Sequence, residues 1–210
     1  MHDQEIVHGG LRGVRFEPHC CYPSHSSHSP KANILINNDG HACLSGLGLL
    51  TIPSDQRIAT PLDAMGDAVQ WMSPELIAPR KFSLENRATK ESDCYALGMV
   101  IYEVLSEQVP FAPREGTAII SDVVGGERPG RPQGREGARF TDGLWQMLEG
   151  CWKHQPGDRP ILGVVLACLQ DDGKLTVRPR QGGPKGGLVS KAFRNTLKAF
   201  NVIAGKPHGP

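Results

Sequence analysis

Residues 92–106 read SDCYALGMVIYEVLS, and this stretch decides the fold. Its large aliphatic side chains recur at intervals of three and four residues, the spacing of one face of a helix: Leu97, Val100, Ile101, Val104 and Leu105. Ser92 and Asp93 are predicted to cap the start of this helix, and Pro110 closes the segment. The strongest predicted helix therefore covers residues 92–106.

Shorter elements are predicted on both sides of this helix. The apolar runs 32–36 and 42–50 flank the turn sequence Asn37-Asn38-Asp39-Gly40 and predict a β-hairpin. Residues 53–70 and the Gly/Pro/Arg-rich residues 112–140 are predicted as loops. Two further helices are expected downstream, one capped by Thr141 and carrying Trp145 and Trp152, and one from Pro160 through Leu169.

The composition of the chain sets limits on its class. With 210 residues, 39% of them hydrophobic, the chain is long enough to bury one sizeable core. No run approaches the ~20 apolar residues of a membrane-spanning helix, and the N-terminus has no basic-then-apolar leader pattern. The six cysteines show no disulfide framework. We therefore expect a reduced, cytoplasmic protein.

The net charge of +1 conceals two oppositely charged parts. Residues 174–210 contain eight Lys or Arg and no acidic residue, which leaves −7 on the rest of the chain. Residues 171–187 are predicted as a Gly/Pro/basic linker and residues 188–210 as a basic amphipathic tail. The tail fits binding to acidic lipid or nucleic acid, docking on the acidic body, or a solubilising end.

Four segments within residues 1–170 occur in an order that resembles the C-terminal lobe of a protein kinase. The last of them matches a signature of the tyrosine-kinase-like group. Residues 6–13 with 32–36 correspond to the catalytic loop, and Trp71–Leu76 to the end of the activation segment. Ser92–Val100 correspond to the start of the central helix. Cys151-Trp152 with Pro156, Arg159 and Pro160 correspond to the C-W-x(n)-P-x-x-R-P signature.

This resemblance implies a mainly α-helical fold with a small β-hairpin near the catalytic loop. It also implies roles for individual residues. Glu75 and Arg159 are expected to form a buried, structural ion pair. Asp93 is expected to hold the catalytic loop through its backbone N–H groups, His8 to be structural, and Asn33 to be a weak Mg²⁺ ligand or a hairpin cap.

The pattern fails at two positions that carry the chemistry of the family. Gly10 stands where the kinase template has the aspartate that accepts the substrate proton, and Gly46 stands where the D-F-G aspartate is expected. Glycine offers neither a base nor a metal ligand. ATP and Mg²⁺ are therefore implied by the resemblance alone, and their binding by this chain is doubtful.

The chain begins just upstream of the catalytic-loop segment, so we expect the N-terminal lobe to be absent. Without it, helix 92–106 would lose a packing neighbour. We therefore predict an exposed apolar patch on that helix, which would mark either a face for a protein partner or an instability.

Residues 14–31 interrupt the catalytic-loop pattern. The template places Asn five positions after the Asp, whereas Asn33 follows Gly10 by 23 positions, so 18 residues are extra. The segment has no helical or strand period and is predicted as an irregular insertion. Valine codons begin GT and a lysine codon can end AG, so a translated intron is one hypothesis. A zinc site is a weaker alternative, on His19, Cys20, Cys21, His25 and His28.

Three functions remain open from the sequence. The first is a catalytically inactive, pseudokinase-like protein, the second a fragment or faulty gene model of an active kinase, and the third a non-enzymatic interaction module with a basic tail. The intact family transfers the ATP γ-phosphate to protein Ser, Thr or Tyr hydroxyls.

Overall fold

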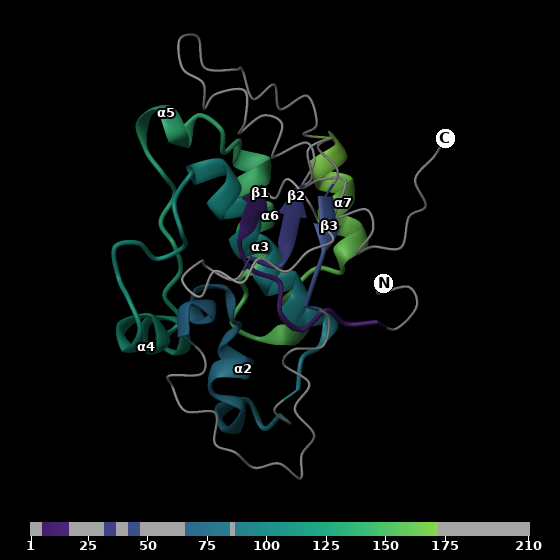
Figure 1. The fold of residues 1–210 in the computed structure, drawn as a ribbon, viewed down its shortest axis with the longest axis vertical. Helices are drawn as coiled ribbons and strands as arrows, with labels where there is room; N and C mark the ends of the chain where they lie inside the picture. Colours follow the sequence, from purple (N-terminus) through teal and green to yellow (C-terminus); the bar gives the residue numbers. More distant parts are fainter. Residues whose placement is uncertain (1–5, 17–31, 37–41, 47–65, 85–86, 172–210) are drawn as a thin grey trace.

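The computed structural model describes residues 6–16, 32–36, 42–46, 66–84 and 87–171. This part of the chain is mainly helical (Figure 1). The strands are β1 (Val14–Phe16), β2 (Ile34–Ile36) and β3 (Ala42–Leu44). The α-helices are α2 (Pro74–Ile77), α3 (Lys90–Ser106), α4 (Thr117–Gly125), α5 (Gly134–Gly137), α6 (Asp142–Cys151) and α7 (Leu162–Asp171). Three 3₁₀-helices join them: η2 (Gly66–Trp71), η3 (Pro79–Phe82) and η4 (Pro156–Asp158).

Helix α3 is the centre of the fold, and it begins earlier than predicted. Its N-cap is Thr89, whose side chain accepts a hydrogen bond from the Ser92 backbone N–H, while the Ser92 hydroxyl accepts one from the Thr89 N–H. This is a capping box, in which two otherwise unpaired donors are satisfied reciprocally. The prediction of Ser92 and Asp93 as the caps is wrong, because Ser92 takes the third helical position of the box.

Burial of α3 is nearly complete. Only Lys90, Glu91 and Glu103 of its residues are not buried, and α6, η2, α5 and η4 contact it. The predicted exposed apolar patch on this helix is therefore wrong. Its aliphatic side chains are buried, and the large exposed apolar residues of the described ranges lie elsewhere, notably Ile161 and Val164 around the start of α7.

The three short strands form one sheet in the order β1-β2-β3, side by side in Figure 1. Strands β2 and β3 pair antiparallel and lie within the two apolar runs predicted as a hairpin. Strand β1 pairs parallel with β2, with Val14 opposite Ile34. The prediction of an irregular segment from residue 14 is therefore wrong for its first three residues, because β2 offers its free edge to them. Residues 17–31 lie outside the described part.

The C-terminal helices agree more closely with the sequence. Thr141 caps α6, and its side chain accepts a hydrogen bond from the Leu144 N–H. Trp152 is 3% exposed, whereas Trp145 is only partly buried. The loop predicted over residues 112–140 contains helix α4, whose Ile119 and Val123 are fully buried. These two side chains, four residues apart, anchor α4 to the core and override the surrounding Gly and Pro residues. No helix of the described residues is long and apolar enough to cross a membrane.

Gly98 allows the close packing of α3 against α6. A Cβ atom built on Gly98 would lie 2.5 Å from the Trp152 Nε1 and 2.9 Å from the Cys151 Cβ, both nearer than real Cβ atoms approach. The indole of Trp152 therefore occupies the space that any other residue at position 98 would need.

We expect Gly98→Ala to lower the free energy of unfolding by about 1–3 kcal/mol, because the added methyl group overpacks the core. The direction of the change in stability is informative, since replacing Gly by Ala inside a helix normally stabilises a protein by ~1 kcal/mol. Gly163→Ala in α7 is the matched control, because a Cβ built there meets nothing within 4 Å. Urea unfolding of both variants measures the difference. Stabilisation by Gly98→Ala would contradict the packing argument.

Candidate functional site

Glu75 and Arg159 form a buried ion pair between α2 and the segment after η4. The Arg159 Nη1 and Nη2 donate to the two Glu75 carboxylate oxygens, each at 2.7 Å, and the side chains are 0% and 3% exposed for Arg159 and Glu75. The remaining guanidinium N–H groups donate to the backbone carbonyls of Lys153, Glu91 and His154. All five donors of the guanidinium are thus used, which is what a buried arginine requires. This is the contact that the motif resemblance implies.

Asp93 links the first turn of α3 to the segment that contains Gly10. Its Oδ2 accepts the His8 backbone N–H at 2.7 Å, and its Oδ1 accepts the Gly9 N–H at 2.9 Å. These two hydrogen bonds tie the backbone of the loop to the start of the helix. Gly9 has φ of 72°, and a Cβ built on it would lie 2.9 Å from the Ala88 Cβ, so glycine is needed for this approach. The segment that resembles the catalytic loop is thus held against the start of α3 by Asp93, as the resemblance implies.

Gly10, Asn33 and Gly46 converge beside this link. A Cβ built on Gly10 would lie 3.5 Å from the Asn33 Nδ2 and 3.9 Å from the Gly46 carbonyl oxygen. The Asn33 Nδ2 itself donates to the Gly10 carbonyl oxygen at 2.6 Å. Asn33 is buried, with 5% of its surface exposed. The three positions predicted to hold the general base and two metal ligands are therefore neighbours, and only Asn33 has a side chain there.

His8 is fully buried next to the Asp93 carboxylate. Burial lowers the pKa of its imidazole from the ordinary value, and the negative charge of Asp93 opposes this shift without overcoming it. The ring is therefore neutral at pH 7. The buried, neutral ring, together with the hydrogen bond from the His8 backbone N–H to Asp93, fits the predicted structural role of His8.

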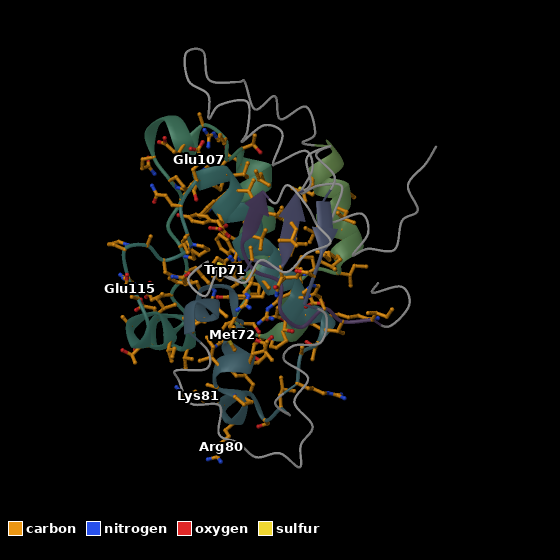
Figure 2. All side chains as sticks on the ribbon, in the orientation of Figure 1. Trp71, Met72, Arg80, Lys81, Glu107 and Glu115 are labelled. Carbon is orange, nitrogen blue, oxygen red and sulfur yellow. The ribbon has the colours of Figure 1, made fainter. Side chains whose placement is uncertain are left out.

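Trp71 and Glu103 form a contact that the sequence did not reveal. The Trp71 indole Nε1 donates to the Glu103 Oε2 at 3.0 Å and ties η2 to α3. Figure 2 shows Trp71 in the middle of the molecule. Glu103 is partly buried, and this loss of hydration raises its pKa to about 7, while the hydrogen bond from Trp71 partly opposes that rise. The available signal was that Glu103 is the one charged residue in the otherwise largely apolar run 94–105.

We expect Glu103→Gln to stabilise the protein at pH 8 and to have little effect near pH 5. The folded protein holds the Glu103 proton up to about pH 7, whereas the unfolded chain releases it near its model value of 4.5. Stability from this group is thus full below pH 4.5 and is lost as the pH rises to about 7. Glutamine cannot ionise and keeps an oxygen acceptor for Trp71.

Thermal unfolding at pH 5 and pH 8 measures this effect. The matched control is Glu149→Gln, because Glu149 accepts a hydrogen bond from the Trp145 Nε1 at 2.8 Å in an exposed position. The control variant is expected to unfold near the parent chain, because an exposed hydrogen bond contributes little to stability. A Glu103→Gln effect that is the same at both pH values would contradict the assigned pKa.

Several predicted features lie outside the described residues. The residues weighed as a zinc site, the linker from residue 172 and the basic tail are among them. Within the described ranges, no group of three or more His, Cys, Asp or Glu residues is placed to hold a metal ion.

ATP and Mg²⁺ were implied by the kinase resemblance, so the fit of the converging residues to Mg²⁺ can be tested directly. Mg²⁺ is usually bound through one or two carboxylates. Both positions at which the template places carboxylates are glycine, so among these three positions only Asn33 offers a side-chain oxygen, that of a neutral amide. The residues present do not fit the metal.

Comparison with known proteins agrees with the motif order. A family model for protein tyrosine and serine/threonine kinases matches residues 30–169. A probable serine/threonine-protein kinase of Dictyostelium discoideum is 28% identical over 140 residues, which cover 66% of this chain and 14% of that protein. A tyrosine-protein kinase of Spongilla lacustris is 28% identical over 141 residues, which cover 66% of this chain and 38% of that protein. The match to the family model begins after His8–Gly13, which the contacts with Asp93 attach to the matched part.

Proposed function

Because the chain belongs to the protein tyrosine and serine/threonine kinase family, we propose that it retains the family's scaffold and has lost phosphoryl transfer. One observation carries the proposal: Gly10 and Gly46 face each other beside Asn33, where the kinase template has two carboxylates. Two structural contacts that the resemblance implies are present, by contrast, since Asp93 holds the loop and Glu75 pairs with Arg159. The signature around Cys151-Trp152 supports the tyrosine-kinase-like group.

The loss of these two carboxylates has a large expected effect on the rate of phosphoryl transfer. General-base assistance contributes about 10²–10⁴ to the rate of a proton transfer, and glycine supplies none of it. The carboxylate missing at Gly46 removes the charge that would hold a divalent cation against nucleotide phosphates. The protein is therefore a pseudokinase-like member of the family.

Thermal unfolding with and without Mg·ATP tests the proposal. A ligand present at 100 times its Kd would add about 2.7 kcal/mol to stability, which is a shift of several degrees in Tm. We expect no saturable shift, and no transfer of labelled γ-phosphate to generic Ser/Thr or Tyr substrates. A saturable shift that requires Mg²⁺, or labelled product above a no-enzyme blank, would overturn the proposal.

A second candidate is an active kinase whose sequence carries two altered codons. The space around Gly10 favours it, because a Cβ there would make only ordinary contacts, at 3.5 Å or more. Gly46 has φ of 72°, a conformation that Asp tolerates better than most residues. If the double variant Gly10→Asp, Gly46→Asp gains Mg²⁺-dependent phosphoryl transfer, the second candidate is supported. If it gains none, the pseudokinase-like reading stands.

A role in binding follows for a protein without phosphoryl transfer. The exposed apolar pair Ile161 and Val164, 75% and 55% exposed at the start of α7, supports a surface for a protein partner. The basic tail supports contact with acidic lipid or nucleic acid. The free, buried thiols of Cys94 and Cys151 support a cytoplasmic location. Co-sedimentation with anionic vesicles, compared between the full chain and a chain ending at residue 173, tests the tail.

A further inference from the structure

The two ends of the 14–31 segment meet in space. A Cβ built on Gly13 would lie 3.1 Å from the Ala32 Cβ and 3.3 Å from the Ala32 Cα. Adding the length of one C–C bond, the Cα atoms of Gly13 and Ala32 are within about 5 Å, close to the 3.8 Å that separates neighbours along a chain. The chain therefore leaves the site after Gly13 and returns to nearly the same point at Ala32.

The hydrogen bonds at this point are those of a tight turn. The Asn33 N–H donates to the Arg12 carbonyl oxygen at 2.9 Å. If Gly13 were joined directly to Ala32, Arg12 and Asn33 would be the first and fourth residues of a β-turn, and this contact would be its closing hydrogen bond. Gly13 would be the second residue, and its φ of 54° suits that position in the turn types that require a positive φ there.

The contacts that the structure describes at the site join residues on either side of the segment. Asn33 bonds to the Gly10 carbonyl oxygen, Asp93 bonds to the His8 and Gly9 N–H groups, and the Ser45 N–H donates to the Asn33 carbonyl oxygen at 3.0 Å. The described contribution of the segment is the pairing of β1 with β2. Its loss would leave β2 an edge strand of three residues.

We propose that residues 14–31 are inserted into a preformed β-turn and are dispensable for the fold and for the arrangement of Gly10, Asn33 and Asp93. The turn Arg12-Gly13-Ala32-Asn33 is the native connection of this loop. This inference does not depend on whether the protein transfers phosphate.

The test is deletion of Val14–Lys31 from the full chain. We expect a cooperatively folding protein whose Tm lies within about 4 °C of the parent, the equivalent of about 1 kcal/mol for a chain of this size. Hydrogen exchange should show the Asn33 amide protected in both proteins, because its partner is the Arg12 carbonyl oxygen in both. A Tm lower by more than that margin, or rapid exchange of the Asn33 amide in the shortened chain, would overturn the proposal.

Two further variants complete the test. Gly13→Val within the shortened chain should lower its Tm by at least about 4 °C, since a β-branched residue is strained at positive φ. An unchanged Tm there would show that the turn does not form. Replacing Val14–Lys31 by a Gly/Ser sequence of equal length is the second variant, expected to fold. If this replacement folds and the deletion variant does not, the two ends cannot be joined directly. If neither variant folds, the native segment is required. Either outcome would refute the proposal.

Discussion

Arg159→Ala is expected to lower the free energy of unfolding by about 3–5 kcal/mol, one of the largest effects of any single change in the chain. The substitution leaves the Glu75 carboxylate buried without its partner, in a position where the side chain is 3% exposed. It also removes the donors to three backbone carbonyls, among them those of Lys153 and Glu91. A chain of this length loses about 2–4 °C in Tm per kcal/mol, so the expected fall in Tm is roughly 6–20 °C.

The matched control for this prediction is Arg114→Ala. Arg114 also pairs with a carboxylate, that of Asp122, but its side chain is 56% exposed. Exposed pairs contribute about 0–1 kcal/mol, so the control should unfold near the parent chain. The double variant Glu75→Gln, Arg159→Met should recover part of the loss, because it removes both buried charges together. An Arg159→Ala variant as stable as the control would contradict the assigned role.

Asp93→Ala is expected to cost about 3–6 kcal/mol. Hydrogen bonds to a charged group contribute about 1.5–3 kcal/mol each, and the Asp93 carboxylate accepts two, from the N–H groups of buried His8 and Gly9. The loss is local as well as global, because the His8–Gly13 segment would lose its attachment to α3. Faster hydrogen exchange of the His8 and Gly9 amides should therefore accompany the fall in stability.

Asp142→Ala serves as the control for Asp93. Asp142 also lies in the first turn of a helix, α6, but its side chain is 86% exposed, and it pairs with Arg131 at the surface. We expect its replacement to cost less than about 1 kcal/mol. Urea unfolding gives the free energies for both variants. Equal losses would show that Asp93 acts only as a helix N-terminal charge and not through the loop.

The extent to which the sequence predicted this structure differs between elements. The central helix was predictable, because its apolar residues repeat at helical spacing over several turns. Its start was not, since Thr89, Ser92 and Asp93 are all good cap residues and the choice depends on tertiary contacts of Asp93. Helix α4 was missed because its flanks are rich in Gly and Pro, while burial of Ile119 and Val123 stabilises it.

The site was predictable where residues act through the backbone or through paired charges. The order of motifs placed Glu75, Arg159 and Asp93 in contacts that the structure contains. Trp71 and Glu103 were not predictable as a pair, because residues 32 positions apart on different elements carry no shared local signal. The exposed patch on helix 92–106 was wrong for a similar reason. Sequence indicates which side chains are apolar, but packing by α6, η2 and α5 decides which remain exposed.

Gly10 and Gly46 also bear on how this chain can evolve. Two carboxylates held a few ångströms apart repel each other, and folding has to offset that repulsion in an enzyme that needs both for catalysis. With glycine at both positions, the repulsion is absent, while the contacts of Asp93 and Arg159 remain. If the protein is inactive, as proposed above, selection for stability and selection for activity no longer compete at this point of the molecule.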